Sequence, residues 1–391
     1  MTEAAPARDT ASLGNEPRID AEEILAGILE WVEVETPTYH GAEVNKLADK
    51  VQVVWDEAGC TVDRIPGRDG FGDHVLVRSP DWEEDKPSLL VLSHMDTVHP
   101  MGTKEGANPI RREGDSVFGP GIYDMKAGAY LPYYAWRHLK RMGRAHGMPV
   151  TWLYVSEEEV GSPTSREVIE REARKAKYVL VTEPARDGGK IVTARKGVGR
   201  FELKITGRPS HAGAQHQDGR SAVKELAHQI LEIEGYTDYE RGITTNVGLV
   251  QAGTGVNVVP RDATAEIDLR VVTAADGEAM TARIRNRVAR DPDVTVEATG
   301  GMNRPPYERS PAIEALFEQA KALAAKGGLD LVSTPLTGGG SDGNFSAAIG
   351  VPTLDGLGAD GKGAHTLHEQ IYVSSLEPRA RMWVELLAGL K

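Results

Sequence analysis

Five short segments of the chain place histidine or acidic residues beside glycine or directly after an apolar run. They are residues 93–98 (SHMDTV), 119–128 (GPGIYDMKAG), 156–162 (SEEEVGS), 182–184 (TEP) and 365–369 (HTLHE). Each segment alone has an ordinary explanation, such as a polar loop, a helix N-cap or a solvated acidic turn. Histidine nitrogens and carboxylate oxygens are also the ligands that zinc and related divalent ions take in proteins. The chemistry therefore has to be judged from the five segments together.

One residue from each segment gives a set of two histidines and three carboxylates: His94, Asp124, Glu159, Glu183 and His365. Two divalent ions would have their charge neutralised by three carboxylates and one hydroxide. Such a set is typical of a two-metal hydrolytic centre in which one carboxylate bridges ions about 3.5–4 Å apart. Nitrogen and oxygen donors favour zinc, with cobalt or manganese as substitutes. An adjacent acid with a raised pKa would serve as the general base.

Apolar runs at residues 88–92, 150–155 and 178–181 precede three of these segments, and a helical pattern covers 125–142. Strand-like runs without alternation, separated by a helix, predict a mainly parallel sheet covered by helices. Two more helices are expected at 21–34 and 42–58, the first with Asp20 as N-cap and Glu23 as its capping-box partner. Ligands of parallel sheets bind beyond the carboxyl ends of the strands, where the polar segments stand.

The pattern changes between residues 196 and 305. Residues 199–206 and 264–272 alternate apolar and polar side chains, as half-buried antiparallel strands do. A small two-layer α+β unit is completed by helical patterns at 221–234 and 275–290 and a strand-like piece at 294–298. A helix expected at 310–326 returns to the pattern of the residues before 196. We therefore expect a mobile tail at 1–18, a catalytic domain at 19–195 and 306–391, and an inserted domain at 196–305.

Composition excludes several classes of protein. The chain has 391 residues and a formal net charge of −13, which is unfavourable for binding nucleic acid or an anionic membrane. No run approaches the roughly 18 apolar residues of a membrane span. The single cysteine, Cys60, cannot form an internal disulfide. The first residues lack the pattern of a secretory signal, so a cytoplasmic protein is expected.

In this order, the segments S-H-M-D-T-V, G-P-G-I-Y-D-M-K-A-G, S-E-E-E-V-G-S, T-E-P, P-S-H-A-G and G-G-G-S-D resemble the motifs of a di-zinc metallopeptidase family. That family includes glutamate carboxypeptidase, acetylornithine deacetylase, succinyl-diaminopimelate desuccinylase and aminoacylase, and the T-E-P segment is most similar to the glutamate carboxypeptidase branch. The resemblance implies that His94 and Glu183 hold one zinc. It likewise implies that Glu159 and His365 hold the other and that Asp124 bridges the two.

The resemblance also implies roles for residues that are not metal ligands. Glu158 would be the general base and acid, and Asp96 would orient His94. The inserted domain resembles the family's lid or dimerisation domain, whose His211 would reach the partner subunit's active site and stabilise the oxyanion. Four further residues would contact the substrate: Asn257, Arg270, Arg304 and Gly340. Asn257 and Arg270 would bind the carboxylate of the substrate, and Gly340 would make its contact through its own backbone.

Two positions depart from the family pattern. The acidic run usually reads Asp-Glu-Glu, whereas residues 157–159 are all glutamate, which leaves the roles of the second and third acids open. The last motif usually reads H-x-x-N-E or H-x-x-D-E, whereas here His368 stands at the position of the asparagine or aspartate. His365 and His368 are therefore both candidates for the last ligand, and the register of Glu369 favours His365.

The reaction implied by the resemblance is metal-dependent hydrolysis of an amide bond in a small substrate with a free carboxylate. We expect carboxypeptidase-like release of a C-terminal amino acid, glutamate being one candidate, from N-acyl amino acids or dipeptides. The enzyme would use two divalent ions per subunit and form a homodimer through the inserted domain. Removal of an acetyl or succinyl group from an N-acyl amino acid is the alternative within the same family.

Two alternatives come from other classes. Residues 339–343 (GGSDG) fit the G-x-S-x-G pattern of a serine hydrolase with Ser341 as nucleophile. Pro335 is unfavourable in the central strand that must precede such a nucleophile, and too little chain follows for the rest of that sheet. A non-enzymatic binding protein that has kept the fold is disfavoured by the complete set of metal-ligand types.

Overall fold

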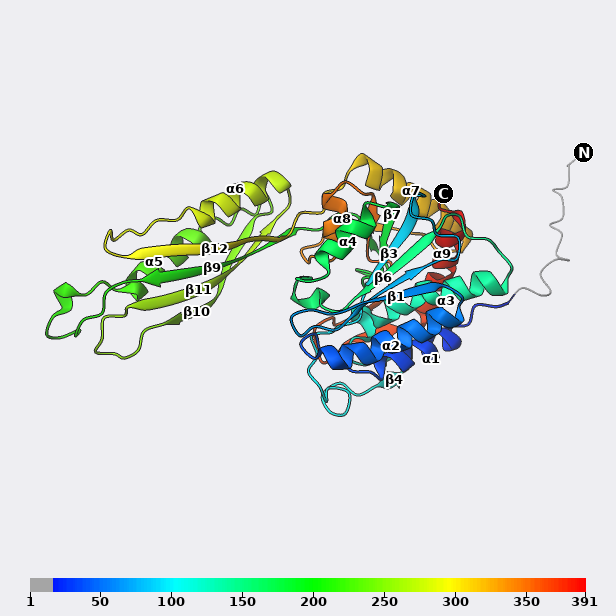
Figure 1. Cartoon of the computed structure of the whole chain (residues 1–391), viewed down its shortest axis with the longest axis horizontal. Coiled ribbons are helices and arrows are strands. Elements are labelled where there is room, and N and C mark those ends of the chain that lie inside the picture. The colour runs from blue at the N-terminus through cyan, green and yellow to red at the C-terminus, as the bar shows by residue number, and fades with distance from the viewer. Residues whose placement is uncertain (1–16) are drawn as a thin grey trace, which may run out of the picture.

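The computed structural model describes residues 17–391, so most of the expected tail at 1–18 lies outside the described residues. The described chain forms a rounded unit with a central sheet and a flat, elongated unit that projects from it (Figure 1). Chain segments near residues 196 and 305 connect the two units. No helix of residues 17–391 is both long and apolar enough to cross a membrane.

The rounded unit contains a six-stranded sheet. Four neighbouring strands of this sheet are parallel. Its spatial order is β1 (Thr61–Ile65), β2 (His74–Arg78), β6 (Val150–Val155), β3 (Ser88–His94), β7 (Ala176–Val181) and β14 (Thr353–Leu354). Strands β6, β3, β7 and β14 run parallel, while β1 and β2 are antiparallel additions. All residues of β3 and β6 are buried, which explains their apolar runs. The mainly parallel sheet expected from the sequence is confirmed.

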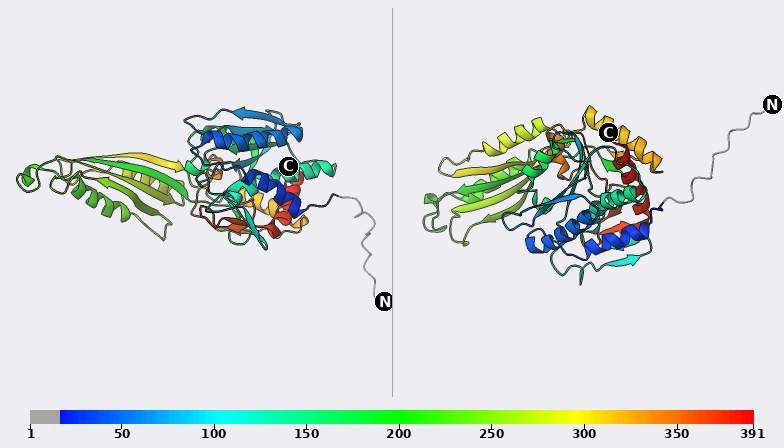
Figure 2. Two further views of the ribbon diagram at one scale, coloured as in Figure 1. Left: turned by 90° about the horizontal axis from the view of Figure 1, so that it is seen from below. Right: turned by 45° about the vertical axis from the view of Figure 1, so that its right-hand side comes forward.

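Helices cover both faces of this sheet (Figure 2). Alternate residues of β3 point to opposite faces, so Leu89 and Val91 pack in one core and Leu90 and Leu92 in another. The larger core takes side chains from α1 (Ala21–Val32), α2 (Gly41–Glu57), α3 (Ala127–Arg141), α7 (Pro311–Lys326) and α9 (Leu376–Gly389). The smaller core takes side chains from α4 (Arg166–Ala173) and α8 (Gly343–Ala348).

The start of α1 differs in one detail from the expectation. Asp20 caps the helix by accepting a hydrogen bond from the amide of Glu22 at 2.8 Å. The expected capping box with Glu23 is wrong, because the backbone amide of Asp20 donates to the hydroxyl of Tyr134 at 3.3 Å. That hydroxyl in turn donates to Glu23 at 3.1 Å. A tyrosine from α3 therefore stands between the two groups that a capping box would join.

The projecting unit is a four-stranded antiparallel sheet with two helices on one face (Figures 1 and 2). Its strands lie in the order β10 (Thr244–Ala252), β11 (Asp262–Val271), β9 (Gly197–Thr206) and β12 (Thr295–Arg304). Helices α5 (Ala222–Glu234) and α6 (Ala274–Arg285) share its separate hydrophobic core. The sequence pattern did not reveal β10, since most of its side chains are exposed and its alternation is lost.

A small sheet lies beside the start of α3 and connects two of the polar segments. Its order is β15 (Gly361–Lys362), β16 (Gln370–Tyr372), β5 (Ser116–Phe118) and β4 (Arg111–Glu113). Strand β5 leads directly into residues 119–128, and β16 directly follows residues 365–369. A further two-stranded sheet pairs β13 (Ser333–Thr334) with β8 (Ile191–Val192).

Candidate metal centre

The polar segments meet at one edge of the large sheet. His94 is the last residue of β3, Glu158 and Glu159 follow β6, and Glu183 follows β7. These three strands are parallel neighbours, so their carboxyl ends lie side by side. Asp124 lies in the turn before α3, and His365 lies in the loop before β16.

The five candidate ligands form two pairs that share the carboxylate of Asp124. Nε2 of His94 lies 3.2 Å from Oδ1 of Asp124 and 3.8 Å from Oε1 of Glu183. On the other side, Nε2 of His365 lies 3.4 Å from Oδ2 of Asp124 and 3.0 Å from Oε2 of Glu159. Each oxygen of Asp124 therefore contacts a different histidine, and each histidine also contacts a different glutamate.

The donor set fits divalent metal ions. The ligand atoms of His94, Asp124 and Glu159 all lie within 4.8 Å of one another, and so do those of His94, Glu158 and Glu183. Zinc binds nitrogen and oxygen at about 2.0–2.2 Å, so two ligand atoms of one tetrahedral ion lie about 3.4 Å apart. The spacings around Asp124 match that distance.

Of the two histidines in the last segment, His365 and not His368 has its side chain in the cluster. The side chain of His365 contacts both Asp124 and Glu159. His368 is exposed in the same loop, and its backbone amide donates to the hydroxyl of Thr366. The geometry thus favours His365 over His368.

Asp96 orients two elements of the centre. Nδ1 of His94 lies 2.9 Å from the backbone oxygen of Asp96 and 3.5 Å from its carboxylate. The same carboxylate accepts hydrogen bonds from the amides of Glu158 at 3.1 Å and Glu159 at 3.2 Å, and from the hydroxyl of Thr38 at 2.7 Å. Asp96 therefore fixes the turn that carries both acids, a role that the residue types alone did not indicate.

The three consecutive glutamates have different environments. Glu157 is fully buried, and its Oε1 accepts hydrogen bonds from the hydroxyl and amide of Thr164 and from the amide of Ser165. Its carboxylate therefore holds the start of α4. Glu158 and Glu159 remain as the acids that face the centre.

Glu158 is paired with a buried arginine. Its Oε1 accepts a hydrogen bond from Nη2 of Arg304 at 2.7 Å, and Nη1 of Arg304 donates to Oδ1 of Asp342 at 2.8 Å. Burial raises the pKa of Glu158 well above its usual value, although the charge of Arg304 opposes this. A carboxyl group with a raised pKa beside a metal centre is suited to accept and return a proton.

The carboxylates of the centre raise the pKa values of its two histidines. Hydrogen bonds to Asp124 and Glu159 raise the pKa of His365 to about 11. Burial disfavours the imidazolium form of His94, yet its hydrogen bonds to Asp124 and Asp96 raise its pKa well above the usual value. Burial, together with the charge of Asp124, raises the pKa of Glu183 to about 8. The cluster therefore attracts positive charge, which protons or metal cations can supply.

Metal binding is accordingly expected to release protons near pH 7. His365 with a pKa of about 11 and Glu183 with a pKa of about 8 carry protons at that pH, whereas metal ligands must be deprotonated. The apparent metal affinity of chelator-treated protein should therefore rise between pH 6 and pH 8. Calorimetric titration with zinc in buffers of different ionisation enthalpy measures the released protons. Heats that do not depend on the buffer would contradict the expectation.

Two predicted site residues lie far from this cluster. His211 and Asn257 are exposed in adjoining loops, where the amide of Ala212 donates to the oxygen of Asn257 at 2.9 Å. These loops follow the ends of β9 and β10 that point away from the rounded unit (Figure 1). Within one chain, neither side chain is brought to the metal centre.

Three other predicted substrate contacts lie at the junction between the two units. Arg270 pairs with Asp268 at 2.8 Å, and its Nη1 donates to the oxygen of Gly338 at 3.3 Å. A Cβ atom at Gly340 would come within 2.7 Å of Cδ of Arg304, so a side chain there would displace the arginine. The guanidinium group of Arg304 itself donates hydrogen bonds to Glu158 and Asp342.

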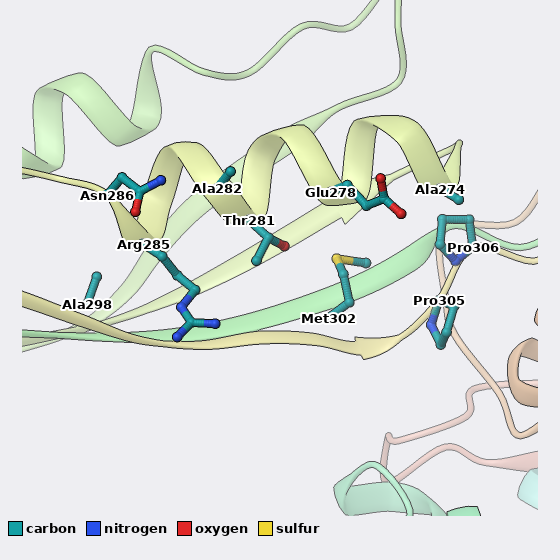
Figure 3. A pocket seen from close by; sticks show the side chains of 11 residues that line it. Ala274, Glu278, Thr281, Ala282, Arg285, Asn286, Ala298, Met302, Pro305 and Pro306 are labelled. Atoms are coloured by element: carbon teal, nitrogen blue, oxygen red, sulfur yellow. The ribbon is translucent and has the colours of Figure 1, made fainter.

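Two other features do not form a reaction site. The hydroxyl of Ser341 donates to Asp355 at 2.5 Å and accepts from the amide of Gly343 at 3.1 Å, which leaves it without the histidine contact of a serine nucleophile. A groove of about 700 Å³ lies between α6 and β12, and Glu278 and Arg285 are its only ionisable lining residues (Figure 3). Neither feature has the donors of the cluster around Asp124.

Comparison with known proteins gives consistent relatives. The model of Peptidase family M20/M25/M40 matches residues 90–389. Carboxypeptidase G2 of Pseudomonas sp. (strain RS-16) is 33% identical over 309 residues, which are 78% of this chain and 74% of that protein. Succinyl-diaminopimelate desuccinylase of Cupriavidus taiwanensis is 26% identical over 354 residues, or 82% of this chain and 90% of that protein.

Solved structures show the same fold. The aminopeptidase PepT from Bacillus cereus superimposes with a TM-score of 0.75 at 24% identity, covering 95% of this chain and 98% of the other. The M20 family metallo-carboxypeptidase Sso-CP2 from Sulfolobus solfataricus gives a TM-score of 0.71 at 19% identity, covering 94% of this chain and 98% of the other. At these identities the similarity concerns the fold alone.

Proposed function

This chain belongs to Peptidase family M20/M25/M40 and is a metal-dependent hydrolase, and from this premise we propose that it cleaves an amide bond with two bound divalent ions. The observation that supports two ions is the arrangement of Asp124 between His94 with Glu183 and His365 with Glu159. Zinc suits these donors best, and cobalt or manganese are expected to substitute.

The bound ions would lower the pKa of an attacking water and polarise the scissile carbonyl. Glu158 would take the proton of that water and return it to the leaving amine. Asp96 holds the Glu158 amide, and Arg304 holds the Glu158 carboxylate, so the direction of the base is fixed from both ends. Glu159 is left to bind metal, since its carboxylate faces His365.

We propose a small substrate with a free carboxylate. A guanidinium group offers a planar pair of donors for a carboxylate, and Arg270 lies at the junction beside the glycine run at 338–340. Asn257 and the backbone of Gly340 would complete the contacts. A substrate anchored in this way would be cleaved by carboxypeptidase-like release of a C-terminal amino acid from an N-acyl amino acid or dipeptide, glutamate being one candidate. The similarity to a desuccinylase keeps removal of an acyl group as the alternative.

A dimer through the projecting unit is supported by the exposed edge at β10. Leu249 of β10 is 61% exposed, and Leu231 of the adjacent α5 is 75% exposed. Among residues 17–391, no exposed large apolar side chain lies on β12, the opposite edge strand. An unpaired strand flanked by exposed apolar residues is suited to pairing with another chain. We therefore infer that β10 pairs with β10 of a second copy.

Such a dimer would bring His211 and Asn257, which lie far from the centre of their own chain, to the centre of the partner subunit. Twofold symmetry makes the two β10 strands antiparallel. Thr244 at the start of β10 pairs with Arg270 near the rounded unit, while Ala252 lies at the far end. The far loops of one copy therefore come beside the rounded unit of the other. His211 and Asn257 would then serve the partner's centre, where His211 would stabilise the oxyanion.

The proposed function is tested by metal analysis combined with a substrate screen. Protein loaded with zinc is expected to bind two ions per subunit and to release free amino acid from a panel of dipeptides and N-acyl amino acids. Chelator is expected to abolish this activity, and a serine-reactive phosphonate is expected not to label Ser341. Activity that persists without metal, or a loaded protein with no amidase activity on the panel, would refute the proposal.

A further inference from the structure

A buried carboxylate outside the ligand set, that of Glu369, lies directly beneath the turn that carries Asp124. We propose that Glu369 is a positioning residue that fixes Asp124 between the two ligand pairs, with His99 as its support. The inference rests on the proposed function, because it takes the clustered side chains as metal ligands.

Four N–H groups surround the Glu369 carboxylate, which is fully buried. Its Oε1 accepts hydrogen bonds from the amides of Tyr123 at 2.9 Å and Asp124 at 2.8 Å. Its Oε2 accepts from the amide of Gly121 at 2.9 Å and lies 2.5 Å from Nε2 of His99. A buried carboxylate is costly unless it is hydrogen-bonded, and here both oxygens are fully used.

The local sheet brings Glu369 to this position. Gln370 pairs with Phe118 in the β16–β5 ladder, and the amide of Gly119 continues the ladder by donating to the backbone oxygen of Glu369 at 3.3 Å. The side chain of Glu369 therefore extends under the turn that follows β5. Gly121 in this turn has a φ of 71°, and a Cβ there would lie 2.3 Å from Thr97. The turn is thus confined between Glu369 and the segment after β3.

Three ligand-bearing segments meet at this one carboxylate. His99 directly follows the segment of His94, the amide of Asp124 is itself a donor, and His365 precedes Glu369 by four residues. Since the two oxygens of Asp124 contact different histidines, a rotation of its backbone would move both contacts at once. Glu369 therefore controls the geometry of the whole centre without touching a metal.

Replacement of Glu369 by glutamine is a near-isosteric test. The new amide nitrogen cannot accept the N–H donors at the oxygen position that it takes. At Oε1 both hydrogen bonds are lost, and at Oε2 the hydrogen bond from Gly121 is lost, while the other tautomer of His99 can accept from the new amide. At least one backbone amide of the turn therefore loses its acceptor. Residues that support metal ligands from outside typically change metal affinity by about 10–100-fold when replaced. A role limited to folding would instead lower stability and leave metal affinity and coordination geometry unchanged.

The experiment compares cobalt binding by the full-length protein and three variants: Glu369→Gln, His99→Phe and the control Glu377→Gln. Glu377 pairs with Arg381 on the surface of α9, so its variant carries the same chemical change away from the centre. Competition with a chromogenic chelator gives the affinity of each ion, and the visible absorption of bound cobalt reports its coordination geometry. Far-UV circular dichroism verifies folding.

We expect Glu369→Gln to bind at least one ion about 10–100-fold more weakly and with an altered cobalt spectrum. His99→Phe removes one donor only and should shift both readouts less, in the same direction, while Glu377→Gln matches the wild type. Wild-type affinity and spectrum in Glu369→Gln would overturn the inference. If Glu369→Gln does not fold, His99→Phe decides by the same criterion. A wild-type protein that binds no metal would instead refute the proposed function.

Discussion

Replacement of Glu158 by glutamine is expected to lower kcat by about 10²–10⁴-fold while the metal content of the protein stays that of the wild type. Glutamine has nearly the same shape and can still accept the hydrogen bond that Arg304 donates to Oε1 of Glu158. It cannot take a proton from water, so the loss falls on catalysis and not on metal binding. Steady-state kinetics and metal analysis of the same preparation measure the two effects separately.

The matched control is Glu167→Gln, an exposed glutamate on the neighbouring helix α4. It should retain wild-type kcat and metal content. Near-normal turnover in Glu158→Gln would contradict the role of general base. Loss of one ion in that variant would instead show that the acid acts as a ligand, which would exchange its assigned role with that of Glu159.

The fold of the rounded unit was largely predictable because its strands are buried on both faces. The continuous apolar runs of β3 and β6 follow from that burial, and polar residues directly after such strands must meet at one sheet edge. The convergence of His94 and Glu183 is a consequence of this topology. Asp124 and His365 lie outside the strands, and their place in the cluster depended on recognising family motifs.

Contacts made by backbone groups were not predictable, because the sequence does not show where an amide points. Asp96 was expected to orient His94, yet its carboxylate also accepts the amides of Glu158 and Glu159. In the sequence, Glu369 indicated only the register of the last motif. In the structure, its carboxylate accepts hydrogen bonds from three backbone amides of another segment. In both cases a carboxylate organises a turn that is remote in sequence.

Arg304 shows a limit of what a family resemblance implies. It was expected to contact substrate, and a buried arginine near a carboxylate-binding site fits that role. In the structure its guanidinium already bonds Glu158 and Asp342. A substrate carboxylate that took the place of Glu158 on Nη2 of Arg304 would free the Glu158 carboxylate from its present contact.

The position of His211 leads to the prediction that is most specific to the dimer. His211 and Asn257 lie at the end of the projecting unit that points away from the centre of their own chain. If they act across the dimer, each centre requires Glu158 from one chain and His211 from the other. Two different inactive variants should then restore each other.

Replacement of His211 by alanine is expected to lower kcat by about 10²–10³-fold, the typical cost of removing one oxyanion donor. His211 is exposed, so folding and metal content should not change. The control is His216→Ala, an exposed histidine of the same loop, which should remain active.

Mixing His211→Ala with Glu158→Gln under conditions of subunit exchange provides the decisive measurement. In a mixed dimer, one centre combines intact Glu158 with the partner subunit's His211, while the other centre lacks both groups. Random exchange makes half of the dimers mixed, so activity should return to about one quarter of the wild-type value. If His211 served its own chain, both centres of every mixed dimer would remain defective. An inactive mixture, or a protein that sediments as an active monomer, would therefore exclude a shared active site.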